Sequence, residues 1–170
     1  MRSIKSIIAA LALTFVAGIG TANAAIQTNV ESHNAVSGGY LWVYSIDITG
    51  AEEVRKGDFF TIYDFAGYVA GTTVAPANWT ATVQNVGLAG PNQGTGPSID
   101  DPALPNLVFT YNGNTALKNA AVQSLLFKAK SVYGAEKDGL SSSQTTKQGS
   151  GNRKNGSTDA ATVPFAPLVP

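Results

Sequence analysis

The sequence contains no cysteine and a single histidine, and only 13% of its residues are charged. Without cysteine the chain can form no disulfide bond, so packing and strand pairing must hold the fold together. One histidine, His33, cannot supply the several His or Cys ligands of a zinc site. It lies in a predicted turn, where a solvated side chain is expected rather than the centre of a Ser-His-Asp arrangement. We therefore predict no catalytic residue.

An excess of charge of one sign is also missing. The sequence has eleven basic and eleven acidic residues, and removal of Arg2 and Lys5 with the N-terminal segment leaves a net charge of −2 (9 − 11). This balance does not provide the basic surface that nucleic acid or an anionic membrane attracts. Neither is expected as a partner.

The first 24 residues have the features of a secretory signal. Arg2 and Lys5 precede an apolar run at 7–20, and Ala22-Asn23-Ala24 matches a small-residue cleavage site. The run is short for a membrane-spanning helix. We expect cleavage after Ala24, no membrane span afterwards, and a secreted or cell-surface location.

Alternation of side chains at period 2 predicts strands along most of the remaining chain. The stretch 57–87 holds the strongest pattern: a strand at 59–65, bulky on both faces and therefore central, and a strand at 79–86 with one face toward water. Further strands are predicted at 26–32, which would be an edge strand, and at 40–48 and 106–111. The large residues on one face of 40–48 are expected in the core: Tyr40, Trp42, Tyr44, Ile46 and Ile48.

Three other segments carry weaker patterns. The Gly- and Pro-rich stretch 87–105 predicts a long loop. Residues 117–133 fit both a helix and a strand, and the neighbouring strands favour a strand at about 123–133. After Gly139 the chain is polar, which predicts an edge hairpin of strands 141–148 and 158–163, with a disordered tail as the alternative.

Six to eight short strands separated by turns indicate an all-β fold, an antiparallel β-sandwich of immunoglobulin-like or jelly-roll-like type. We predict one domain at 25–163, followed by a proline-rich tail at 164–170 that does not suit a central strand.

Candidate site residues fall into three sets. Sugar rings stack on exposed aromatic side chains, and the available rings are those of Trp42, Tyr44, Tyr68 and Trp79. Calcium binds oxygen ligands, which Asp100, Asp101 and Asn106 offer around the proline-rich loop, although turn formation is the more ordinary role for such residues. Glycoside hydrolysis needs two carboxylates, and the candidates are Asp47, Asp58, Asp64, Asp100 and Asp101.

Three stretches of the chain form a recognisable pattern: VRKGDFFTIYDF at 54–65, PANW at 76–79 and DPALPNLVFTY at 101–111. This pattern resembles the ectodomains of secreted bacterial proteins of the PEP-CTERM, or exosortase-sorted, group. The resemblance implies an exported or surface protein linked to exopolysaccharide production. Members of that group end in Val-Pro-Glu-Pro, an apolar helix and a basic cluster.

The C-terminal end departs from that pattern. Val163-Pro164 and Val169-Pro170 stand where the sorting signal would begin, but no Glu, apolar helix or basic cluster follows. We expect either a truncated chain or a relative released to the medium. The expected function is that of an exported, non-catalytic surface or matrix protein, whose partners would be extracellular polysaccharide or other surface proteins. A carbohydrate-binding module is the alternative, and a glycoside hydrolase the third hypothesis.

Overall fold

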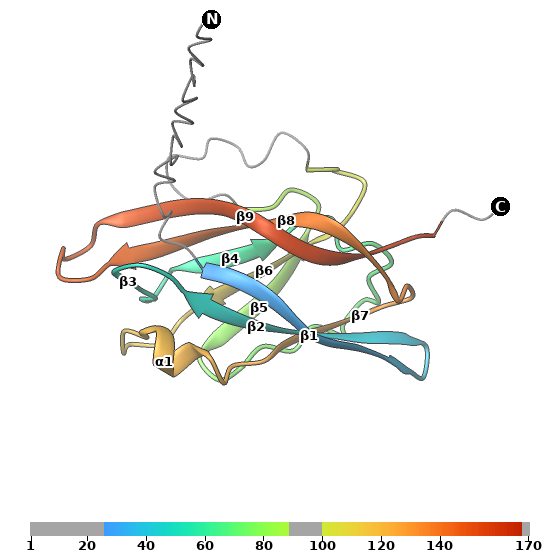
Figure 1. Cartoon of the computed structure of the whole chain (residues 1–170), viewed down its shortest axis with the longest axis horizontal. Helices are drawn as coiled ribbons and strands as arrows, with labels where there is room; N and C mark the ends of the chain where they lie inside the picture. Colours follow the sequence, from blue (N-terminus) through green and yellow to red (C-terminus); the bar gives the residue numbers. More distant parts are fainter. Residues whose placement is uncertain (1–25, 89–99, 168–170) are drawn as a thin grey trace, which may run out of the picture.

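The structure, a computed structural model, describes residues 26–88 and 100–167 and consists of two antiparallel β-sheets packed face to face (Figure 1). This confirms the predicted all-β sandwich. The predicted signal at 1–24 and most of the predicted loop at 87–105 lie outside the described residues. Within the described ranges, no helix has the length and apolar character needed to cross a membrane.

The smaller sheet has three strands in the order β1-β2-β7: β1 (Ile26–Val36), β2 (Gly39–Ile48) and β7 (Phe127–Ser131). Its strands form because large and small side chains alternate along them, so one face can be buried. Trp42, Tyr44 and Ile46 of β2 are at most 1% exposed, which confirms the core face predicted for 40–48. A register shift between Val30 and Ser32 marks a bulge in β1.

The larger sheet contains six strands: β3 (Glu52–Glu53), β4 (Phe59–Ile62), β5 (Trp79–Gln84), β6 (Asn106–Tyr111), β8 (Ala135–Lys147) and β9 (Lys154–Phe165). Strand β8 pairs with β9 on one side and with β3 and β4 on the other. All four residues of β4 are buried, which confirms a central strand covered on both faces for the first part of the strand predicted at 59–65. The strand ends at Ile62, and Asp64 has a left-handed backbone that an extended strand does not contain.

Aromatic rings fill the space between the sheets. Phe60 of β4 stacks on Phe109 at 5.0 Å between ring centroids and meets the edge of Phe127 at 4.9 Å. Trp79 lies 5.9 Å from Phe60 and 5.0 Å from Phe127. Such offset and edge-on contacts are the favoured geometries of aromatic pairs. The cluster joins strands of both sheets and forms the centre of the core.

The ambiguous segment 117–133 contains both of the structures that its pattern fitted. A single helical turn, α1 (Asn119–Val122), buries Val122, and β7 then begins at Phe127. The predicted strand at 123–133 is therefore too long. The observed strand begins four residues after the predicted start, because residues 123–126 make the turn that brings Phe127 into the aromatic core.

The hairpin predicted after Gly139 is present, but its predicted edge position is wrong for its first strand. Strand β8 lies inside the sheet, and its buried hydroxyl side chains find partners there, except that of Ser141, whose Oγ bonds nothing among the described residues. Ser143 bonds Ser157 at 3.0 Å, and Tyr63 bonds Ser142 at 2.8 Å. Strand β9 is the edge, and it continues to Phe165, so the predicted tail loses its first two residues to the sheet. Pro164 is compatible with this strand because an edge strand leaves one side of its backbone unpaired.

Candidate functional site

The aromatic rings predicted to stack on sugars are not available at the surface. Trp42 is 0% exposed, Tyr44 1% and Trp79 7%, because all three belong to the core between the sheets. Trp42 Nε1 donates to the carbonyl oxygen of Tyr133, and Tyr44 Oη donates to that of Thr162, both at 3.0 Å. Burial raises the pKa of Tyr44, with a smaller contribution from the charge of Glu136. The stacking platform is a wrong prediction for these three residues.

Tyr68 is the remaining predicted ring, and it is partly buried. Its ring meets Phe65 edge-on at 6.3 Å between centroids and packs against the core. One partly covered ring leaves the carbohydrate hypothesis without the paired surface rings on which it depended.

The predicted calcium ligands do come together, but as a hydrogen-bonded loop anchor. Asn106 is 0% exposed; its Nδ2 donates to Asp100 Oδ1 at 2.9 Å, and its Oδ1 accepts from the N–H of Asp64. Asp101 Oδ1 accepts from the N–H of Ala103, the turn role considered for it. Among the described residues, no group of three or more His, Cys, Asp and Glu side chains is placed to hold a metal ion. The arrangement accounts for these residues without calcium.

Asp64 offers a test of this anchor through pH. Its backbone is left-handed (φ 55°), and its Oδ1 accepts from the N–H of Asp101 at 3.0 Å. Burial raises the pKa of Asp64, and the charges of Asp100 and Asp101 add to the rise against the opposing effects of the Asp101 hydrogen bond and Lys137. The folded chain therefore holds this proton more tightly than the unfolded chain. The resulting stabilisation is present below the ordinary pKa of 3.8 and is lost as pH rises through the raised pKa.

Asp64→Asn should remove this pH-dependent loss. Asparagine tolerates a left-handed backbone and keeps the oxygen that accepts from Asp101. We expect a variant at least as stable as the parent at neutral pH, with a gain of no more than about 0.5 kcal/mol because the group is partly solvated. Thermal unfolding between acidic and neutral pH measures this, with Asp138→Asn as the control, because Asp138 is exposed and is not among the groups that shift the pKa of Asp64. A variant clearly less stable than the parent at neutral pH would contradict the assignment.

Asp58, a candidate for glycoside hydrolysis, is a structural carboxylate. It is 0% exposed, and its oxygens accept from Lys154 Nζ at 2.6 Å, Thr146 Oγ1 at 2.7 Å and the N–H of Arg55 at 2.8 Å. These contacts tie the start of β4 to the β8–β9 hairpin. A carboxylate enclosed in this way cannot reach a substrate, so Asp58 is unsuited to acid or base catalysis.

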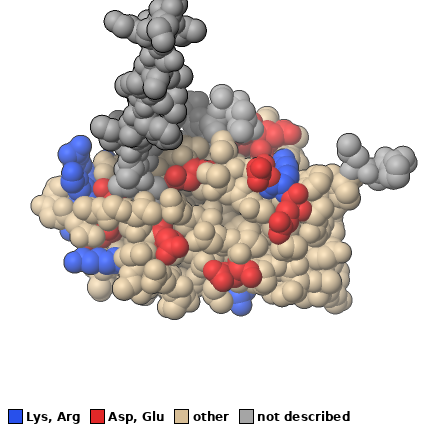
Figure 2. Space-filling model, viewed as in Figure 1, with Lys and Arg blue, Asp and Glu red and all other residues tan. Residues whose placement is uncertain are grey.

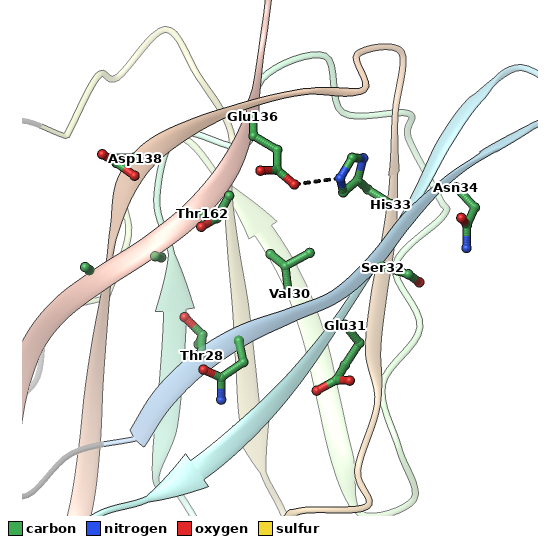
Figure 3. Close-up of a pocket in the computed structure, with 12 residues that line it drawn as sticks. Thr28, Val30, Glu31, Ser32, His33, Asn34, Glu136, Asp138 and Thr162 are labelled. Atoms are coloured by element: carbon green, nitrogen blue, oxygen red, sulfur yellow. Dashed lines mark ion pairs between the residues drawn. The ribbon is translucent and has the colours of Figure 1, made fainter.

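A hollow in the described part of the molecule lies between two edge strands. We call it the edge groove: residues 28–34 of β1 form one wall, and residues 160–162 of β9 with Glu136 and Asp138 of β8 form the other (Figure 3). Its volume is about 690 Å³. Among the residues that the structure describes, β1 pairs with β2 alone and β9 with β8 alone, so each wall has one side without a paired strand there. An edge strand presents backbone N–H and C=O groups that an added strand can bond.

Two side chains of the edge groove hold buried polar atoms without a hydrogen-bond partner. Thr28 is 8% exposed, and its Oγ1 bonds nothing among the described residues. The Nδ1 atom of His33 is in the same state. Buried polar groups are normally satisfied, and leaving one unpaired costs about 1–3 kcal/mol. Both atoms are closed off from the surface, so neither is a contact point for a ligand in the edge groove.

His33 closes one end of the edge groove and is not the turn residue that the sequence predicted. Strand β1 continues past its bulge, so His33 pairs with Trp42 across the sheet and its ring stacks on Trp42 at 4.8 Å. Its Nε2 lies 2.6 Å from Glu136 Oε1, a contact that joins β1 to β8 across the groove (Figure 3). The prediction failed because the polar residues around His33 belong to a half-exposed edge strand, whose composition is that of a turn.

A second, smaller hollow lies beside the β8–β9 turn. It has a volume of about 360 Å³, and Arg55, Lys56 and Lys154 give it a basic lining. Arg55 is held by Glu53 and donates to the carbonyl oxygen of Gly151 in the hairpin turn. The molecule therefore has an acidic groove on one side and a basic hollow at one end.

Comparison with known proteins gives a limited result. No protein-family model matches the chain. No curated protein matches it in sequence either. Among solved structures, the chain is similar to a cohesin module from a family 33 glycoside hydrolase of Clostridium perfringens, with a TM-score of 0.43 and 11% identity over 83% of this chain and 96% of that one. A likeness of this size carries no inference about partners or activity.

The edge groove had no signal in the sequence. Its walls come from the first and last strands of the described chain, and nothing local in either segment says that they lie side by side. Two features of the sequence belong to the groove, the polar run around His33 and the small residues in 158–163, but neither predicts a groove by itself. The structure places both segments on one open side of the sandwich.

Proposed function

We propose that the chain is an exported, non-catalytic β-sandwich of the cell surface or extracellular matrix, and that it works by binding an extended protein segment in the edge groove. The observation that carries this proposal is the pair of free edge strands, β1 and β9, on the two walls of one groove. Binding proteins commonly add an extended peptide to an exposed sheet edge, where backbone hydrogen bonds give affinity and side-chain pockets give specificity. The apolar segment at 7–20 and the cleavage pattern at 22–24 support export.

The shape of the groove suits a peptide in strand conformation. Its β1 wall covers residues 28–34, and seven residues of strand extend about 20 Å. Small side chains, those of Ala160 and Ala161, line the β9 wall and leave room for the side chains of a bound segment. A glycan would need exposed rings to stack on, and the candidate rings Trp42, Tyr44 and Trp79 are buried. We therefore favour protein over polysaccharide as the ligand.

Retention of the purified chain on the washed surface matrix of the producing cells tests this function. We expect retention that disappears after protease treatment of the matrix and survives periodate oxidation of its sugars. Ala160→Trp should abolish retention, because an indole on the exposed β9 wall fills the edge groove. Ala77→Trp, on the exposed turn before β5, is the matched control and should be retained like the parent.

Two results would overturn the proposal. Retention sensitive to periodate but not to protease would make the ligand a glycan. Normal retention of a folded Ala160→Trp variant would place binding outside the edge groove. Circular dichroism and thermal unfolding establish that each variant is folded before its retention is interpreted.

A further inference from the structure

The edge groove has the chemistry of a site for a cationic, donor-rich ligand. The carboxylates of Glu31, Glu136 and Asp138 line it and are exposed, and Asp138 makes no ion pair with any described residue. Glu136 lies 2.6 Å from His33 Nε2, which holds its carboxylate over the β1 wall of the groove. Lysine and arginine, which only donate, match a groove whose free groups are acceptors.

The chain itself carries such a ligand at the turn of its long hairpin. We call residues 147–154, between and at the ends of β8 and β9, the basic tip. Lys147 and Arg153 are exposed there and pair with no carboxylate among the described residues. The turn is ordered by backbone bonds from Lys147 to Arg153 and from Ser150 to Lys147. Figure 1 shows the hairpin projecting at one end of the sandwich, and Figure 2 shows basic side chains grouped at that end and acidic ones across the face of β1 and β9.

We propose that the basic tip of one copy docks in the edge groove of the next copy. This inference rests on the proposed function in one respect, that the edge groove binds protein; the occupant is a hairpin turn of a second copy of the same chain instead of an extended segment. Lysine and arginine of the tip meet the exposed carboxylates of Glu31, Glu136 and Asp138. The tip cannot turn back to its own groove, because the contact of Arg55 with Gly151 and the paired strands β8 and β9 hold it at the end of the sandwich.

The geometry of this contact determines the kind of assembly. Tip and groove are different surfaces, so the contact is head-to-tail and leaves a free tip at one end and a free groove at the other. Such a contact adds copies in open chains unless its rotation closes a ring. Assembly into chains is a suitable property for a protein of an extracellular matrix. Since opposite charges hold the contact, salt should weaken it.

Sedimentation velocity of the chain isolated after export tests the inference over a range of concentrations. At low ionic strength we expect mass to increase with concentration, and at about 1 M salt, where the Debye length is about 3 Å, we expect monomer. Arg153→Glu and Asp138→Lys should each weaken self-association by about tenfold or more, since each places like charges in the contact. Lys118→Glu makes the same change in net charge as Arg153→Glu at an exposed residue beside α1, and it should associate like the parent.

A mixture of the two reversed chains gives the sharpest result. In each variant alone, tip and groove carry like charges and repel. In the mixture, the unchanged tip of Asp138→Lys meets the unchanged groove of Arg153→Glu. The glutamate tip of Arg153→Glu likewise meets the lysine of the Asp138→Lys groove, so both contacts join opposite charges. We therefore expect the mixture to assemble at concentrations where neither variant does. Monomer at every concentration in low salt, or association unaffected by both reversals, would overturn the inference. If such a monomer still binds the cell-surface matrix through the edge groove, the proposed function stands with a different protein partner.

Discussion

Replacing Asp58 with alanine should lower the free energy of unfolding by about 3–5 kcal/mol, because it leaves a half-buried cation and several buried donors without their acceptor. Lys154 Nζ, Thr146 Oγ1, Gln144 Nε2 and the N–H of Arg55 all bond this one carboxylate. The total stability of a domain is about 5–15 kcal/mol, so this loss is a large part of it. Urea unfolding of the parent and the variant measures the difference.

Two further variants separate the buried ion pair from a general effect of losing a carboxylate. Asp138→Ala removes an exposed carboxylate from the same strand pair, and it should change the stability by no more than about 0.5 kcal/mol. Adding Lys154→Met to Asp58→Ala removes the ammonium group that the first change leaves unpaired. The loss of unfolding free energy in the double variant should therefore be smaller than the sum of the losses in the two single variants. A cost below about 1 kcal/mol for Asp58→Ala would show that the ion pair does not fasten the hairpin to β4.

Phe60→Ala should cost about 3–5 kcal/mol, because Phe60 is fully buried and contacts aromatic rings from both sheets. Its ring lies 5.0 Å from Phe109, 4.9 Å from Phe127 and 5.9 Å from Trp79, so its loss leaves a cavity where the two sheets meet. Denaturant unfolding, followed by the fluorescence of the two buried tryptophans, measures the cost.

The matched control for this change is Val86→Ala, since Val86 is 62% exposed and its truncation removes little buried surface. It should alter the stability by no more than about 0.5 kcal/mol. Phe60→Leu keeps most of the volume and should fall between the two. Equal stability of Phe60→Ala and Val86→Ala would contradict the packing of the two sheets around this cluster.

The sequence predicts the core strands well because their side chains alternate strongly. The large residues from Trp42 to Ile48 share a face only if the chain is extended, and burial of that face follows from its size. The same reasoning predicted a central strand at 59–65, and the structure confirms it for Phe59–Ile62. These are local signals, and the strands they predict need no knowledge of their neighbours.

The same reasoning fails for polar strands, whose position in the sheet it predicts wrongly. The run of Ser and Thr in β8 indicates an edge because polar residues usually face water, yet these hydroxyl groups are buried. Partners from other elements make this possible: Thr145 bonds Glu52, Thr146 bonds Asp58 and Ser143 bonds Ser157. Such pairings depend on which strands become neighbours, and no local pattern in the sequence records that.

The candidate site could not be predicted from local sequence patterns either, because it also depends on which strands become neighbours. The sequence pointed instead to aromatic rings, which could stack on sugars, and to the Asp100–Asn106 region, whose oxygen atoms could bind calcium. The structure buries the rings and uses the aspartates in turns. The edge groove arises only when β1 and β9, from opposite ends of the chain, come to lie on one side of the sandwich.

Hydrogen exchange of the chain, free and retained on the washed surface matrix, tests the edge groove as the binding site most directly. We expect slower exchange of backbone amides at residues 28–34 and 160–162 in the retained chain, because a bound segment pairs with the open sides of β1 and β9. The exposed strand β5, at the far edge of the larger sheet, should exchange at an unchanged rate. Protection of β5 with unchanged exchange in β1 and β9 would contradict the account.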